Sequence, residues 1–172
     1  NATDQVTMTN GASITASSLV DPTTSRSGIA NAGNITLSAG RQFDVTNGSS
    51  ITTTTQSPQA NGGNIDIRAV DRIRIVDSTI STSVLGAEGN GGNIFIDPKV
   101  VILQGSEVTA KAVGGAGGNI TFVTPLFMAD PTSVVSASSE RGPSGTVTIQ
   151  SPTSNLSGAV GQLVSKIAPP QV

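Results

Sequence analysis

The sequence of 172 residues contains no cysteine, histidine, tryptophan or tyrosine, and phenylalanine occurs only four times. Without cysteine there are no disulfides and no thiolate metal ligands, a composition compatible with an exported bacterial protein. Without large aromatic residues the chain lacks the side chains that fill a wide globular core. Hydrophobic residues still make up 35% of the chain, too many for simple disorder. This composition favours a narrow core of small aliphatic side chains.

Charge is scarce as well. Charged residues make up 12% of the chain, against about 25% in a typical domain. The net charge is −2 and the basic residues are scattered singly, so we expect no nucleic-acid partner. The apolar runs are too short for a membrane span, and the opening "NATDQVTMT" does not resemble a signal segment. We therefore expect no membrane insertion, and we interpret the sequence as a fragment whose export signal lies upstream.

A glycine-rich segment recurs along the chain and is followed each time by alternating apolar residues. Its copies are "NAGNITLSA" from Asn31, "NGGNIDIRA" from Asn61, "NGGNIFIDP" from Asn90, "GAGGNITFV" from Gly115 and a degenerate "PSGTVTIQS" from Pro143. The apolar pairs are Ile35 and Leu37, Ile65 and Ile67, Ile94 and Ile96, Ile120 and Phe122, Val147 and Ile149. Alternation with period two predicts a strand. A phosphate-binding loop would occur once, before a helix, so the segment is interpreted as a structural corner.

Two further apolar columns complete the repeat. The second consists of Val6 and Met8, Phe43 and Val45, Ile73 and Ile75, Val101 and Leu103, Leu126 and Met128. The third begins at Ile14, Ile51, Ile80, Val108 and Val135. Three short strands in each repeat of 26–30 residues predict an all-β chain in which every coil stacks on the next. We predict a parallel β-helix of about five coils over residues 1–150, with an N-terminal edge that was continuous with more coils.

The corner residues have predicted structural roles. We expect the corner glycines to adopt a conformation that a β-carbon would obstruct: Gly33, Gly63, Gly92, Gly118 and Gly145. The asparagines that follow them should stack into an amide ladder that ends at Thr146: Asn34, Asn64, Asn93 and Asn119.

The iterated "GGNI-x-I" corners, the third strands "NGASITAS", "NGSSITTTT" and "GSEVTAKA", and the closing "GTVTIQSPTSNLSG" carry a family resemblance. They resemble the filamentous-haemagglutinin-type exoproteins of two-partner secretion systems in Gram-negative bacteria. The resemblance implies a right-handed β-helix, export through an outer-membrane partner transporter and a location outside the cell or on its surface. It also implies service as an adhesin or extracellular fibre, with a glycan or protein receptor on a host or neighbouring cell. End-to-end self-association is a further expectation.

Catalytic residues, a metal site and a cofactor are not predicted. Asp66 stands alone in its outward column, whereas Asp97 should lie one coil from Arg68 and Asp44 one coil from Arg74, as surface ion pairs. Calcium-binding repeats would carry aspartate where these corners carry asparagine. A carbohydrate-active β-helix, a polysaccharide lyase or hydrolase, remains the alternative. A cluster of carboxylates and basic side chains from adjacent coils, within about 10 Å in a groove, would favour that alternative.

The third strands predict a hydroxyl face on the outside of the coil. Its central column is Thr15, Thr52, Ser81, Thr109 and Ser136. Regular Thr-x-Thr faces resemble ice-binding solenoids, but Lys111 interrupts the next column and serine replaces threonine in much of the array. We therefore favour a soluble strand surface and keep an ice-binding face as a lesser alternative.

Loops after the third strand should emerge at one edge, where solenoids often bind ligands. Our candidate ligand contacts there are Asp21, Arg26, Glu88, Glu140 and Arg141. The repeat stops at residue 151, and residues 151–172 are expected to form a non-repeating tail or cap. Spacings of four, three and four permit a short helix there, through Leu156, Val160, Leu163 and Ile167, whereas the family resemblance favours an extended tail.

Overall fold

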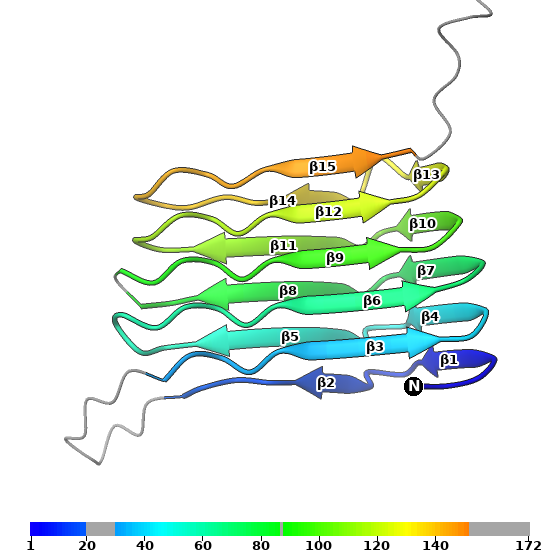
Figure 1. Cartoon of the computed structure of the whole chain (residues 1–172), viewed down its shortest axis with the longest axis horizontal. Helices are drawn as coiled ribbons and strands as arrows, with labels where there is room; N and C mark the ends of the chain where they lie inside the picture. Colours follow the sequence, from blue (N-terminus) through cyan, green and yellow to red (C-terminus); the bar gives the residue numbers. More distant parts are fainter. Residues whose placement is uncertain (20–29, 87, 152–172) are drawn as a thin grey trace, which may run out of the picture.

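The computed structural model describes residues 1–19, 30–86 and 88–151. In this part of the chain there are fifteen strands and no helix, arranged as three five-stranded parallel sheets (Figure 1). Sheet A consists of β3 (Ile35–Ala39), β6 (Ile65–Ala69), β9 (Ile94–Asp97), β12 (Ile120–Val123) and β15 (Val147–Gln150). Sheet B consists of β1 (Gln5–Met8), β4 (Gln42–Thr46), β7 (Arg72–Val76), β10 (Val100–Gln104) and β13 (Leu126–Ala129). Sheet C consists of β2 (Ser13–Thr15), β5 (Ser50–Thr55), β8 (Thr79–Val84), β11 (Glu107–Ala112) and β14 (Val134–Ser136).

One strand from each sheet forms a coil, in the chain order B, C, A, so that β1–β3 are coil 1 and β13–β15 are coil 5. Each strand pairs in parallel with its equivalent in the adjacent coils. In sheet A, for example, Ile35 pairs with Ile65, and Ile65 pairs with Ile94. The predicted parallel β-helix with three strands per turn is confirmed, whereas its right-handed sense stays a prediction from the family resemblance.

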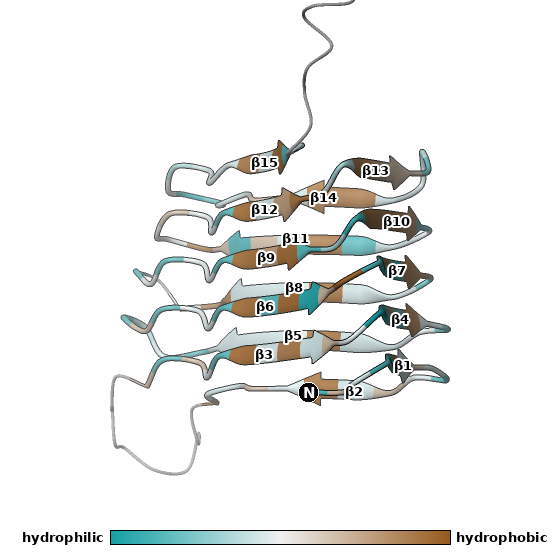
Figure 2. Cartoon of the chain, turned by 45° about the vertical axis from the view of Figure 1, so that its right-hand side comes forward, coloured by the Kyte–Doolittle hydropathy of each residue, from teal (hydrophilic) through white to brown (hydrophobic). Residues whose placement is uncertain are grey.

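The core is a stack of aliphatic columns inside the coils, visible as apolar bands across the strands in Figure 2. The largest fully buried side chains are Phe43, Phe122, Ile51, Ile65, Ile67, Ile73, Ile75, Ile80, Ile94, Ile96, Leu103 and Ile120. Burial of one such side chain contributes about 1.5–3 kcal/mol. The columns therefore supply a continuous core, as the near absence of aromatic residues predicts.

The predicted phase of the second strand is wrong in coil 5. Phe127 and Ala129, rather than Leu126 and Met128, pair with the inward residues of β10. Leu126 and Met128 face outward and are about half exposed, whereas the Phe127 ring packs edge to face on Phe122, with centroids 4.9 Å apart. All four residues of "LFMA" are apolar, so alternation alone does not distinguish the two faces of this strand.

The corner glycines are required because adjacent coils stack closely on them. The predicted reason, a backbone conformation that a β-carbon would obstruct, is therefore corrected. Positive φ angles occur elsewhere among the described glycines, at Gly11, Gly48 and Gly105. A β-carbon at Gly92 would instead overlap the carbonyl oxygen of Gly63, one coil earlier. The same overlap with the preceding corner glycine occurs at Gly63, Gly118 and Gly145. At Gly33, in coil 1, the closest atom to an added β-carbon would be the Ala16 β-carbon at 3.3 Å.

The asparagine ladder is present at these corners. The Oδ1 of Asn34 accepts a hydrogen bond from the backbone N–H of Asn64 at 2.8 Å, and the same bond repeats from coil to coil. At its end, both the backbone N–H and the hydroxyl of Thr146 donate to Asn119. The ladder thus satisfies one backbone donor in each of coils 2–5.

A second ladder lies three residues earlier and was missed in the sequence. Asn31, Asn61 and Asn90 each accept from the backbone N–H one coil later, the last of them from Ala116. The repeated spacing "N-x-G-N" is the signal that would have revealed it.

Buried threonines of sheet C satisfy the carbonyl groups of the same corners. The hydroxyl of Thr53 donates to the Gly63 carbonyl, and that of Thr82 donates to the Gly92 carbonyl, both at 2.8 Å. Because both hydroxyls are fully buried, these bonds offset their desolvation.

Candidate functional site

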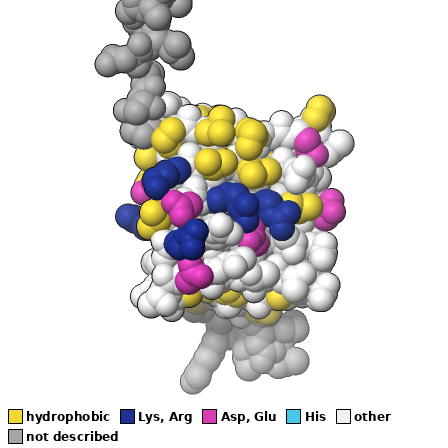
Figure 3. Space-filling view, turned by 90° about the vertical axis from the view of Figure 1, so that its right-hand side faces the viewer, with side chains coloured by type: hydrophobic (Ala, Val, Ile, Leu, Met, Phe, Trp, Pro, Cys, Tyr) yellow, Lys and Arg dark blue, Asp and Glu magenta, His cyan; other side chains and the backbone are white. Residues whose placement is uncertain are grey.

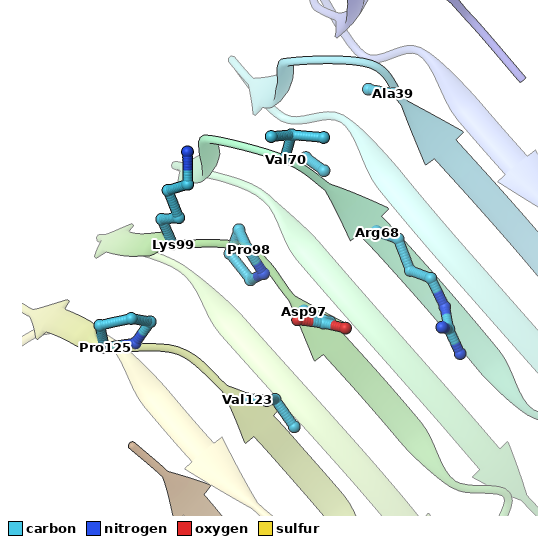
Figure 4. A pocket seen from close by; sticks show the side chains of 9 residues that line it. Ala39, Arg68, Val70, Asp97, Pro98, Lys99, Val123 and Pro125 are labelled. Atoms are coloured by element: carbon cyan, nitrogen blue, oxygen red, sulfur yellow. The ribbon is translucent and has the colours of Figure 1, made fainter. Parts of the chain in front are cut away.

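A hollow lies at the corner between sheets A and B. At this place the corner of one coil is one residue shorter than the corner of the coil before it. Three residues, 69–71, separate the paired positions Arg68 and Arg72, whereas two residues, 98–99, separate their partners in the next coil. The resulting step leaves Val70 56% exposed beside Pro98. This corner hollow measures about 420 Å³ and is lined by Ala39, Arg68, Ala69, Val70, Asp97, Pro98, Lys99, Val123 and Pro125 (Figure 4).

Arg68 is held in place at one side of the corner hollow. Its Nε and Nη2 donate to the two carboxylate oxygens of Asp66 at 2.8 and 2.9 Å, and its guanidinium lies 5.0 Å from the Phe95 ring centroid. The hydrogen bond to Asp66 raises the pKa of Arg68. Asp66 stands alone in its register column, between Thr36 and Phe95, as predicted. The sequence reasoning missed that Arg68 lies two residues later on the same face of the same strand.

Lys99 lies at the other side of the corner hollow. It is the last of four side chains of alternating charge, one from each of four successive coils, which form a charge column. Asp4 and Arg41 lie 3.8 Å apart, Arg41 and Asp71 3.5 Å, and Asp71 and Lys99 3.0 Å. The hydrogen bond from Lys99 holds the pKa of the Asp71 carboxyl below its usual value. Sequence reasoning missed this column, although each member immediately precedes a strand of sheet B.

Asp97 is the carboxylate that faces the corner hollow. It pairs in register with Arg68, as predicted, and contributes electrostatically to the raised pKa of that residue. The hydrogen bonds of Arg68 nevertheless go to Asp66. Among the described residues, Asp97 forms neither a hydrogen bond nor an ion pair, and it is half-buried. It is thus an acceptor available to a ligand, next to an oriented guanidinium.

The predicted pairing of Asp44 with Arg74 is confirmed on the outer face of sheet B. Asp44 is almost fully buried, lies 3.1 Å from Arg74 and 3.4 Å from Arg72, and also accepts a hydrogen bond from Gln5. Figure 3 shows charged side chains beside an apolar area on this face. Outward Ile102 and Met128 line a second hollow there, of about 610 Å³. Because both arginines already contact Asp44, this face offers few uncommitted polar groups.

The hydroxyl face occupies the outside of sheet C, and its central residues are in one register column. Neighbouring hydroxyls contact one another: Thr15 lies 3.4 Å from Thr52, and Thr109 donates to Ser81 at 3.1 Å. Thr109 is buried, and the residues on either side of it along the strand, Glu107 and Lys111, form an ion pair at 2.8 Å. The hydroxyl face is therefore interrupted in coil 4.

The candidate contacts at the corner between sheets C and A do not form a charged cluster. Glu88, Glu140 and Arg141 are exposed, and none of them forms an ion pair within the described ranges 1–19, 30–86 and 88–151. Glu88 accepts a hydrogen bond from Gln59, and Glu140 lines a hollow of about 340 Å³. Asp21 and Arg26 lie outside the described residues, as do residues 152–172 of the predicted tail or cap.

In the part of the chain that the structure describes, no group of three or more acidic, cysteine or histidine residues is placed to hold a metal ion. No helix in that part is long and apolar enough to cross a membrane. Comparison with known protein families, curated proteins and solved structures finds no match to this chain. The corner hollow, which combines a step in the stack, a carboxylate and two cations, is therefore the candidate site that the geometry itself favours.

Proposed function

We propose that the chain is part of a secreted or cell-surface solenoid that acts as an adhesin or as an extracellular structural fibre. The observation that carries the proposal is the unbroken stacking of its ladders through all the described coils. Such stacking gives a rigid rod with flat, repetitive outer faces, which suits multivalent contact better than a single deep active site. The resemblance to filamentous-haemagglutinin-type exoproteins adds a partner transporter and export across the outer membrane to the proposal.

Adhesion can be measured with beads that carry the purified chain. We expect beads with the wild-type chain to adhere to surfaces coated with neutral polysaccharides or to cultured cells, and beads with Ile94→Asp, which disrupts the core, to lose adhesion. Electron microscopy of the same preparations tests for fibres. Absence of both adhesion and fibres would contradict the proposal. Secretion is tested separately, by expressing the complete reading frame with and without a neighbouring transporter gene.

A carbohydrate-active β-helix is the second candidate, and the corner hollow is the observation that favours it. Its carboxylate and its cations come from adjacent coils, which is the arrangement that such enzymes use. The test is incubation with neutral and acidic polysaccharides, followed by measurement of new reducing ends and unsaturated products. Cleavage that disappears in Asp97→Asn but not in Glu107→Gln would favour the enzyme over the adhesin.

A further inference from the structure

The floor of the corner hollow is apolar and comes from three successive corners. Val70 projects from the corner after β6, Pro98 follows β9, and Val123 and Pro125 belong to the end of β12 and the corner after it. Figure 4 shows Val70 and Pro98 between Lys99 on one side and Arg68 on the other, with Val123 and Pro125 farther along the stack. Aliphatic carbons of this kind present a surface on which the C–H face of a ring can pack.

The polar groups at the edge of the floor are complementary to hydroxyl groups. The Nε and Nη2 of Arg68 are used by Asp66, so no hydrogen bond within the described residues occupies its Nη1. Asp97, its register partner in the next coil, is the carboxylate without a hydrogen bond. A hydroxyl group both accepts and donates, and it can therefore accept from a guanidinium while it donates to a carboxylate. Two adjacent hydroxyls would match this donor and acceptor best.

The charges around the corner hollow favour a neutral ligand over an anionic one. Arg68 and Lys99 are the cations of its lining, but each is bound by a carboxylate, Asp66 and Asp71 respectively. Asp71 is also paired with Arg41, whereas Asp97 forms no ion pair with a described residue and adds an unpaired negative charge to the lining. A uronic acid would bring a further negative charge next to Asp97 without an uncommitted cation to compensate it.

We propose that the corner hollow is a binding site for a neutral saccharide with adjacent hydroxyl groups. Asp97 accepts and Arg68 donates hydrogen bonds to the hydroxyls, while the saccharide packs on the exposed Val70 and Pro125. The volume of about 420 Å³ lies in the lower part of the range for ligand pockets, about 300–1,000 Å³, which suits a short saccharide segment. This inference rests on the proposed adhesive function and names the ligand class of one site within it.

The test uses saturation-transfer NMR and titration of the whole chain with neutral disaccharides, namely cellobiose, mannobiose and chitobiose, and with digalacturonate. We expect at least one neutral disaccharide to bind and digalacturonate to bind at least about tenfold more weakly. Asp97→Asn should weaken the neutral ligand about tenfold, which corresponds to about 1.4 kcal/mol. Val70→Ser should weaken it less. Glu107→Gln, a matched carboxylate-to-amide change on the outer face of sheet C, should leave it unchanged.

Thermal unfolding of each variant separates loss of binding from loss of fold. Binding of no neutral disaccharide, preference for digalacturonate, or equal effects of Asp97→Asn and Glu107→Gln would each overturn the assignment. Wild-type beads that adhere although no neutral disaccharide binds the chain would overturn the saccharide site while leaving the adhesive function intact. Absence of both adhesion and fibres in the wild-type chain would instead contradict the function itself.

Discussion

The middle coils and coil 5 contain the same kinds of inward residue, yet they differ in burial. Ile94 in β9 and Ile120 in β12 are buried, with 1% and 0% exposed. Val147, which pairs in register with Ile120, is 44% exposed, and Ile149 is 50% exposed. This difference shows that a side chain that points into the coil is not buried for that reason alone. Each coil is buried by the coils on either side of it.

The largest contrast should come from a charge in the aliphatic columns. Ile94→Asp places a carboxylate where no partner compensates it, so we expect a loss of about 4 kcal/mol or more of unfolding free energy. Ile149→Asp, on the half-exposed side of coil 5, should lose about 1 kcal/mol or less. Urea unfolding of both variants measures the contrast. Equal losses would mean that coil 5 is as deeply buried as the middle coils.

Glycine stacking gives the next largest effect. Gly92→Ala would place a β-carbon on the Gly63 carbonyl oxygen, so we expect a loss of about 1–3 kcal/mol. Gly33→Ala should change stability by about 0.5 kcal/mol or less, since its φ is not in the left-handed region and its added methyl meets only the Ala16 β-carbon. Thermal unfolding compares the two. A large loss in Gly33→Ala would show that a requirement other than stacking acts at these corners.

The asparagine ladder should show a smaller difference. Asn93→Ala removes the acceptor of the Asn119 N–H and the donor to Asn64, so we expect a loss of about 0.5–1.5 kcal/mol. Thr146→Ala, at the last rung of the ladder, removes only the hydroxyl that donates to Asn119 and should cost less. Amide hydrogen exchange at Asn119 checks the first variant directly. Unchanged protection there would contradict the proposed role of the ladder.

The smallest effect should be the pH dependence of the stability of the fold that arises from Asp71 and Lys99 in the charge column. The pKa of Asp71 is lowered in the folded chain, chiefly by its hydrogen bond from Lys99. Such a carboxyl contributes stability that is present above the unfolded pKa of about 3.9 and is lost as pH falls through the lower folded value. Lys99→Gln should therefore reduce the loss of stability below about pH 4. Melting curves across this range that match the wild type would contradict the coupling.

Most of the fold could be predicted because its signal is repeated. Ile35, Ile65 and Ile94 recur at nearly constant spacing after the same corner, so an error in one coil is corrected by the others. The prediction failed at Leu126 and Met128, where apolar residues occupy both faces of β13. A count from the preceding strand does not identify the inward residue either, because Leu37 to Phe43 and Ile67 to Ile73 span six positions but Ile96 to Val101 spans five.

The candidate site was much less predictable than the fold. Asp97 and Arg68 were placed in adjacent coils from the repeat, but the partner of Arg68 depends on rotamers within one strand. The corner hollow depends on the loss of a single residue between residues 69–71 and 98–99. A periodic pattern describes what the coils share, whereas this site arises where two consecutive coils differ.

The rung-by-rung pairing also determines how the molecule responds to a pulling force. Ladder partners are separated by 30, 29, 26 and 27 residues, and each coil pairs only with the coils before and after it. Tension along the stack acts on every coil alike, but an outermost coil pairs with a neighbour on one side only and therefore detaches first. Each detachment releases one coil, which extends by about 3.3–3.6 Å per residue, or on the order of 100 Å. The solenoid lengthens in nearly equal steps and dissipates mechanical work at every step.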